Sequence, residues 1–311
     1  MVETITAEKF KEMLPSICCM ETSQDPKNWT PENPLWGHCA VVSLVAQNLF
    51  GGELLRASLE NTEFAAGKSH YWNCLAGGQE EDFTKVQFGD RYPVDLKAEV
   101  RPRSYVLSYP ETKERYKLLA WRLLRKIYGT NQVGAYNPLL SSFYYKECFD
   151  AALDSPCQKM WFGCAIEHNG IIIHSDCNRI IEPLRPLCEP QCIRFSIASR
   201  TESMIGACGH AEEWALWEVV KMGVPLGECN LFIAGFYPNG LPYLKEKAEH
   251  SCLRCAVQMY HAKIKKIYVP VRLIENEKLK VPMPEYISWQ SIDAEEALKT
   301  ALLYATGKKK T

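Results

Sequence analysis

The stretch GHAEEWALWEVVKMGVPLGECNLFIAGF, residues 209–236, predicts a helix that begins at His210, followed by a buried strand at Asn230–Phe236. A second stretch, HSCLRCAVQMYHA at residues 250–262, predicts another helix with two cysteines in its first turn. Imidazole nitrogen and thiolate sulfur are preferred zinc ligands, and three protein ligands leave a fourth position for water. The two stretches therefore predict a zinc site with His210, Cys252 and Cys255 as its ligands.

Helix geometry places this site at two helix starts. Residues three apart on an α-helix lie about 60° apart around its axis, so Cys252 and Cys255 can face one metal. His210 and Glu212 lie about 160° apart, so they can share a site only beyond the first turn. The positive ends of both helices would stabilise thiolates and a bound hydroxide. Zinc would lower the pKa of its water, and Glu212 would carry the proton to a leaving amine.

The pairing of H-x-E with a later C-x-x-C resembles the cytidine/deoxycytidylate deaminase superfamily over about residues 140–272. The resemblance implies an αβα sandwich with a mixed sheet, a Zn²⁺ cofactor, and hydrolytic deamination of a free base, nucleoside or nucleotide. By position in the family, Asn178 and Ser203 would contact the substrate. Ser251 replaces the usual proline, and the long gap after His210 implies an insertion near Pro238–His250 that shapes the pocket.

Several alternatives remain open for the C-terminal part. The protein could be a polynucleotide-editing deaminase, or a non-catalytic zinc-containing binding or regulatory protein. The C-x-x-C could be a structural zinc half-site or a redox pair, and His210 a helix cap or a core residue. Four other cysteines could form a second, structural zinc site or be buried free thiols: Cys177, Cys188, Cys192 and Cys208.

The N-terminal part carries a separate set of reactive residue types. Cys39 begins an apolar helix predicted over His38–Phe50, where a thiol becomes a better nucleophile. His70 and Asp82 follow in strand-like segments, in the order of papain-like and transglutaminase-like folds, where a histidine activates the thiol and an acid orients the histidine. The sequence of residues 29–90 is similar to that of the YunG-like family. Either this is a hydrolase, amidase or acyl-transferase centre, or the three residues are structural.

The predicted elements divide the chain into an α+β domain at 1–108, a helical connector at 109–137 and a deaminase-like domain at 138–311. The connector holds a helix predicted over Tyr116–Tyr128. The last region alternates helix and strand, including a hairpin turned at Asn169-Gly170, which indicates an α/β fold within an α+β protein overall.

Composition limits the class of protein. The 311 residues carry a formal net charge of −1, which disfavours a general nucleic-acid binder and favours a small-molecule substrate. The N-terminus lacks the apolar stretch of a secretion signal, and no run is long enough to span a membrane. Fourteen cysteines then favour a reducing compartment, so we expect a cytoplasmic protein. The family resemblance adds the expectation of a homo-oligomer.

Overall fold

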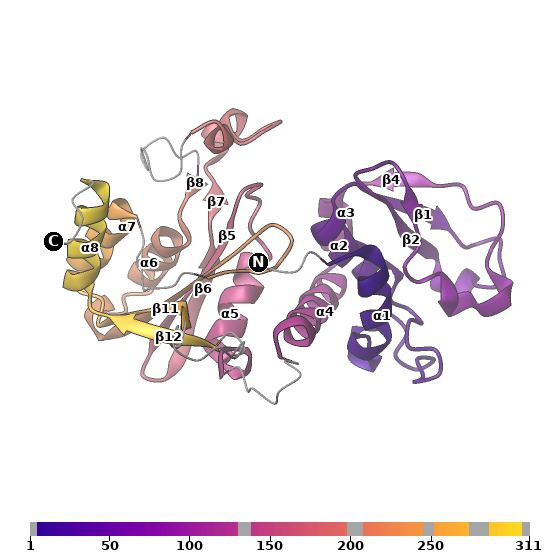
Figure 1. Cartoon of the computed structure of the whole chain (residues 1–311), viewed down its shortest axis with the longest axis horizontal. Coiled ribbons are helices and arrows are strands. Elements are labelled where there is room, and N and C mark those ends of the chain that lie inside the picture. The colour runs from indigo at the N-terminus through magenta and orange to yellow at the C-terminus, as the bar shows by residue number, and fades with distance from the viewer. Residues whose placement is uncertain (1–4, 130–137, 198–207, 245–251, 274–285, 307–311) are drawn as a thin grey trace, which may run out of the picture. The chain divides into compact units, whose positions relative to one another are not determined.

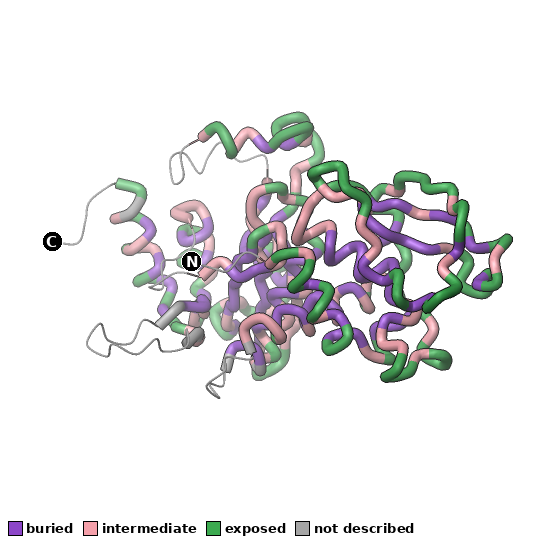
Figure 2. The backbone as a smooth tube through the Cα atoms, turned by 45° about the vertical axis from the view of Figure 1, so that its right-hand side comes forward, coloured by how far each residue is buried: buried purple, intermediate pink, exposed green. Residues whose placement is uncertain are grey.

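The computed structural model describes residues 5–129, 138–197, 208–244, 252–273 and 286–306 (Figure 1). The chain divides into two compact units, Met1–Ile127 and Tyr128–Thr311. Buried residues gather in stretches such as 39–46 and 231–236, and exposed ones are frequent along the turns (Figure 2).

The N-terminal unit is an antiparallel sheet with packed helices. Its strands are β1 (Glu53–Ser58), β2 (Ser69–Cys74), β3 (Glu80–Glu81) and β4 (Glu99–Arg101), in the order β3-β2-β1-β4. Its helices are α1 (Ala7–Ile17), α2 (Cys39–Phe50), α3 (Arg103–Leu107) and α4 (Pro110–Gly129). Short 3₁₀ turns cover Met20–Thr22, Ala65–Gly67 and Lys85–Arg91.

Helix α2 forms the centre of this unit. All eight residues from Cys39 to Ala46 are buried, because the helix is apolar around its whole circumference rather than along one stripe. It packs on β1 and β2, and the buried Asn73 of β2 donates a hydrogen bond to the carbonyl of Ser43 (3.0 Å). The start of α2 is therefore fixed against the strand that carries His70.

Helix α4 belongs to this unit up to Ile127, whereas we expected its residues in a connector of their own. The hydroxyl of Tyr116 accepts hydrogen bonds from Asn48 (2.7 Å) and Arg103 (2.6 Å), and Arg122 donates to the carbonyl of Ile17. These contacts attach the helix to α1, α2 and α3, so it is part of the packed unit.

The C-terminal unit is built on a mixed sheet. Its strands are β5 (Trp161–His168), β6 (Ile171–Cys177), β9 (Cys229–Phe236), β10 (Pro242–Tyr243), β11 (Lys266–Leu273) and β12 (Tyr286–Ile292), with β7 (Arg179–Ile180) and β8 (Cys208–Gly209) pairing separately. The order is β12-β11-β9-β5-β6, and β9 and β11 are parallel. Its helices are α5 (Phe143–Ala152), α6 (Ala211–Lys221), α7 (Leu253–His261) and α8 (Ala294–Ala305). Short 3₁₀ turns cover Pro138–Ser141, Glu182–Leu187, Ile193–Phe195 and Leu226–Glu228.

Helices cover both faces of this sheet (Figure 1). Cys164 and Ile166 of β5 pack in the core that α6, α7 and α8 close on one face. Gly163, next to them on the strand, points to the other face, where a Cβ would lie 1.7 Å from the carbonyl oxygen of Cys148 in α5. The αβα arrangement and the mixed sheet predicted for this part are confirmed.

Some elements were predicted and others were not. The β5–β6 hairpin turns at Asn169 (φ 54°) and Gly170 (φ 82°), as the Asn-Gly pair predicts. We did not predict β12 and α8. Where its burial is described, β12 buries only Ile292, and α8 packs with small residues, Ala297 and Ala301, so neither shows a strong hydrophobic period. Among the described helices, none combines the length and apolarity needed to cross a bilayer.

Candidate functional site

His210, Cys252 and Cys255 meet at two helix starts. His210 is the residue before α6, Cys252 is the residue before α7, and Cys255 lies in the first turn of α7. Nδ1 of His210 lies 3.3 Å from the sulfur of Cys252 and 3.2 Å from that of Cys255, and the two sulfurs are 3.7 Å apart. The sequence predicted that these three residues share one site, and the fold places them together.

These distances fit a tetrahedral zinc ion. Zinc at ordinary bond lengths to two thiolates and one imidazole separates the sulfurs by about 3.8 Å and each sulfur from the nitrogen by about 3.5 Å. Among the described residues, these three are the set whose donor atoms all lie within 4.8 Å of one another. The donor set therefore suits zinc, with one coordination position left for a small molecule.

The pKa values of the two thiols also suit metal binding. A hydrogen bond from Cys255 lowers the pKa of Cys252 to about 4, against the opposing effect of burial. The pKa of Cys255 is raised by that same hydrogen bond, by burial and by the charge of Glu212. Cys252 is therefore the easier of the two thiols to deprotonate, as a thiolate ligand must be.

Glu212 lies beside this group. It is the second residue of α6 and is 4% exposed, and its charge acts on both His210 and Cys255. A carboxylate is rarely buried without a partner or a function. Its place at a helix start, next to the imidazole, puts a proton acceptor at the edge of the candidate metal centre.

Sequence reasoning missed the residues that hold the two helix starts together. Glu213 accepts hydrogen bonds from the backbone N–H of His210 (2.8 Å) and from Gln258 (2.7 Å), and it forms an ion pair with Arg254. Burial raises the pKa of Glu213, but the Arg254 hydrogen bond and the other contacts lower it overall. The i, i+4 spacing of Arg254 and Gln258 on one helix face was the available signal.

Asn178 and Ser203 were predicted to contact the substrate. Asn178 is buried, and its amide accepts from the N–H of Phe162 (2.7 Å) and the hydroxyl of Ser155 (2.9 Å) and donates to the carbonyl of Met160 (3.0 Å). Its amide therefore holds the start of β5 and the segment before it, and a contact with a substrate stays a prediction. Ser203 lies outside the described residues, as do 245–251 of the predicted insertion.

The predicted second metal site is not assembled. Cys177 is buried at the end of β6, and burial and the charge of Asp176 raise its pKa to about 11. Cys188, Cys192 and Cys208 act electrostatically on one another and on Cys157, which sequence reasoning left out. Gln158 brings Cys157 to this group by accepting from the N–H of Cys192 (3.1 Å). No three of these donors meet the spacing that His210, Cys252 and Cys255 meet in the described chain.

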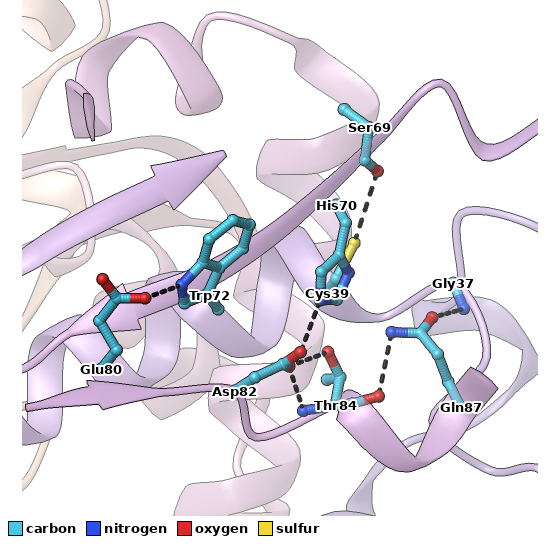
Figure 3. Close-up of polar contacts among 9 residues, drawn as sticks. All are labelled: Gly37, Cys39, Ser69, His70, Trp72, Glu80, Asp82, Thr84 and Gln87. Carbon is cyan, nitrogen blue, oxygen red and sulfur yellow. Dashed lines mark hydrogen bonds and ion pairs between the residues drawn. The ribbon is translucent and has the colours of Figure 1, made fainter. Parts of the chain in front are cut away.

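The N-terminal unit brings Cys39, His70 and Asp82 together (Figure 3). Nε2 of His70 lies 2.7 Å from Oδ2 of Asp82, and the Cys39 sulfur lies beside the imidazole with its thiol 4.0 Å from the carbonyl of Ser69. Burial lowers the pKa of His70, but the hydrogen bonds and charges of Asp82 and Cys39 outweigh it and raise that pKa to about 9. Nδ1 of His70 is buried and has no conventional hydrogen bond to the described residues.

A second histidine next to Cys39 does not compete for this role. His38 directs Nδ1 to the carbonyl of Trp36 (2.9 Å) and Nε2 to the hydroxyl of Thr22 (2.8 Å), and burial lowers its pKa to about 4. It is therefore neutral at physiological pH, and both of its nitrogens are used within the protein. His70 is the histidine with a nitrogen available to the thiol.

A buried glutamine connects the two sides of this group. Gln87 accepts from the N–H of Gly37 (3.2 Å) and donates to the carbonyl of Thr84 (3.1 Å), while Thr84 donates to Asp82 through its N–H (3.0 Å) and hydroxyl (3.1 Å) (Figure 3). These bonds fix the acid relative to the turn before Cys39. Sequence reasoning missed Gln87 and Thr84, which carry no motif.

Comparison with known families agrees with this division of the chain. Residues 6–128 match the family described as YunG protein, and residues 140–271 match the cytidine and deoxycytidylate deaminase zinc-binding region. No curated protein and no solved structure matches the chain.

Proposed function

Because the chain joins an N-terminal region of the YunG family to a cytidine and deoxycytidylate deaminase zinc-binding region, we propose that it is a zinc-dependent hydrolytic deaminase. The observation that carries the proposal is the spacing of the donor atoms of His210, Cys252 and Cys255, at 3.2 to 3.7 Å. Its substrate class would be a free base, nucleoside or nucleotide with an exocyclic amine.

The reaction replaces a C–N bond of the ring with a C–O bond and releases ammonia. Zinc, when bound, supplies the Lewis acid that makes water nucleophilic near neutral pH. Glu212 would accept the proton of that water and deliver it to the ring and the leaving amine. Its burial beside His210 and Cys255 supports this role, because a purely structural zinc site needs no extra carboxylate.

A small substrate is favoured over a polynucleotide. The net charge of −1 offers little electrostatic attraction for a polyanion, whose binding depends on clustered Lys and Arg. Activity on an oligonucleotide that falls steeply between low and moderate salt would favour the polynucleotide alternative. A homo-oligomer stays part of the proposal, and light scattering of the purified protein would test it.

Ammonia release over a panel of bases, nucleosides, nucleotides and oligonucleotides tests the proposal, with zinc content measured on the same sample. We expect release from at least one small substrate and zinc in the protein. Zinc without release from any compound would favour the non-catalytic alternative.

We propose a second catalytic function for the N-terminal unit: hydrolysis or transfer of an acyl group with Cys39 as the nucleophile. The 2.7 Å bond between His70 and Asp82, together with the thiol beside the imidazole, favours it. Alkylation of Cys39 by iodoacetamide near pH 6 is the first test. A catalytic thiol reacts there, whereas an ordinary thiol is mostly protonated.

A further inference from the structure

Gly209, the residue directly before His210, lies against an indole ring. A Cβ at Gly209 would lie 2.4 Å from Nε1 of Trp214 and 3.0 Å from Cε2 of the same ring. These distances are well inside van der Waals contact, whose optimum is about 3.5–4.0 Å. Trp214 is the fourth residue of α6, so its ring packs back on the residue that leads into its own helix. The backbone at Gly209 approaches the ring this closely because it carries no side chain.

Arg179 meets both residues of this contact. In the two-stranded piece formed by β7 and β8, Arg179 is the antiparallel partner of Gly209 (Figure 1). Its guanidinium carbon lies 5.6 Å from the centroid of a ring of Trp214, within the range of a cation–π contact. Gly209, Trp214 and Arg179 therefore contact one another in all three pairs.

A buried carboxylate holds Arg179 in place. Asp176 forms an ion pair with Arg179 at 2.7 Å, and its side chain has no exposed surface, whereas 52% of the Arg179 side chain is exposed. Asp176 also accepts the backbone N–H of Cys177 (2.7 Å) and lies opposite Cys164 of β5 in the sheet. Breaking such a pair would leave a buried charge without compensation, which is strongly unfavourable. The contact at Gly209 is thereby connected to the mixed sheet.

Trp214 acts here through the position of its ring. Its Nε1 is buried and has no hydrogen-bond partner among the residues that the structure describes. A buried donor that is left unpaired costs about 1–3 kcal/mol. The packing on Gly209 and the contact with Arg179 offset this cost, so the ring is used for its shape and its π face.

We infer that Trp214 is a positioning residue of the candidate zinc centre, because its ring fixes the backbone at Gly209 from which His210 reaches the metal. The inference rests on the zinc site proposed above. The N–H of His210 is bonded to Glu213 (2.8 Å), so contacts from α6 hold both this residue and the one before it. A functional site needs its side chains within about 0.5 Å of the productive geometry. A fixed backbone before His210 is therefore a condition for tight zinc binding.

Zinc affinity of the full chain, measured by competition with a fluorescent chelator, tests the inference. Gly209→Ala places a methyl group against Nε1, so the ring and the backbone must separate. We expect its zinc affinity to fall by about tenfold, as for other residues that orient metal ligands. In Gly209→Ala/Trp214→Leu the leucine has no atom at the positions of Nε1 and Cε2, so the methyl group fits. This double variant should bind zinc more tightly than Gly209→Ala.

Two further variants complete the comparison. Gly227→Ala is the control, because the nearest atom to its added methyl group lies at 3.6 Å, an ordinary contact, and its zinc affinity should not change. Trp214→Leu alone should weaken zinc binding, since the space left by the ring allows Gly209 to move. Urea unfolding of each zinc-free variant shows whether a change in affinity reflects the site or loss of the fold.

The outcomes separate this inference from the function on which it rests. Wild-type protein that binds no zinc would overturn the proposed deaminase function. Zinc in wild type, with unchanged affinity in Gly209→Ala or no recovery in the folded double variant, would overturn the inference alone. If Gly209→Ala does not fold, Trp214→Leu decides, and wild-type affinity in that variant would overturn the inference.

Discussion

Glu213 of α6 forms an ion pair with Arg254 of α7, and both residues lie in the first turns of the helices whose starts carry the three candidate zinc ligands. The same carboxylate accepts the backbone N–H of His210. Because His210 and Cys255 come from elements 45 residues apart in sequence, their 3.2 Å separation depends on how these two helix starts are held.

Removing this connection should loosen the metal centre. We expect Glu213→Gln to weaken zinc binding by about tenfold, the usual size of an effect from residues that orient metal ligands. Competition with a fluorescent chelator measures it. Glu218→Gln, which alters a more exposed ion pair of the same helix, is the matched control and should leave zinc affinity unchanged.

The same ion pair makes a pH-dependent contribution to stability. The folded-state pKa of Glu213 is lowered, so the contribution is present above the unfolded value of about 4.3 and is lost as the pH falls through the folded value. A double-mutant cycle of Glu213→Gln and Arg254→Gln on the zinc-free protein should give a coupling of about 1–3 kcal/mol at pH 7, since Arg254 is partly exposed. A coupling that is unchanged between pH 7 and pH 3 would contradict this account.

Zinc binding should depend on His210, Cys252 and Cys255 and on no other cysteine. Cys255→Ser should reduce bound zinc from about one per chain to a small fraction, because serine is a poor zinc ligand. Cys188→Ser, which removes a thiol of the predicted second site, should keep the wild-type zinc content. Elemental analysis after gel filtration measures the zinc content of both variants. Two zinc ions per wild-type chain would show that the cysteines near Cys157 also bind a metal.

The raised pKa of His70 predicts that the stability of the N-terminal unit has the opposite pH dependence. Its folded-state pKa is raised to about 9, so its contribution to stability is complete below the unfolded value of about 6.5 and is lost as the pH rises through 9. In Asp82→Asn we expect a smaller loss of stability between pH 6.5 and 9, because the bond that holds the imidazolium is weakened. Urea unfolding across this range measures the difference. Identical profiles in both proteins would mean that Asp82 does not hold a charged imidazole.

Close packing on β5 gives a test of the fold itself. A Cβ at Gly163 would lie 1.7 Å from the carbonyl oxygen of Cys148, so Gly163→Ala requires α5 to move away from the sheet. We expect a loss of about 3 kcal/mol or more in the free energy of unfolding. Gly77→Ala is the control, since nothing lies within 4 Å of its added methyl group. A stable Gly163→Ala would contradict the described contact between α5 and β5.

The sequence predicted the metal ligands well because their chemistry is local. Two helix starts and one intervening strand were enough to bring His210, Cys252 and Cys255 together. Glu213, by contrast, was not recognised, since its role depends on Arg254 from a helix whose approach the sequence does not specify. Gln87 was missed for the same reason, because its link to Gly37 spans 50 residues and follows no motif.

Cysteine and asparagine roles were harder to predict. Cys177 was grouped with Cys188 and Cys192 by nearness in sequence, whereas Gln158 brings Cys157 to them through the fold. Asn178 was assigned by position in a family, and the structure shows its amide bonded to Ser155, Met160 and Phe162. Nearness along a chain and position in a motif cannot show which side chains the fold has already used.

The variant Glu212→Ala tests the central claim most directly. Ammonia release and zinc content are measured together on the variant and on wild type, with the best substrate of the panel. We predict that the variant keeps about one zinc per chain and loses release by at least about 100-fold, because its proton carrier is gone. Ammonia release at the wild-type rate with zinc bound would contradict the proposed mechanism.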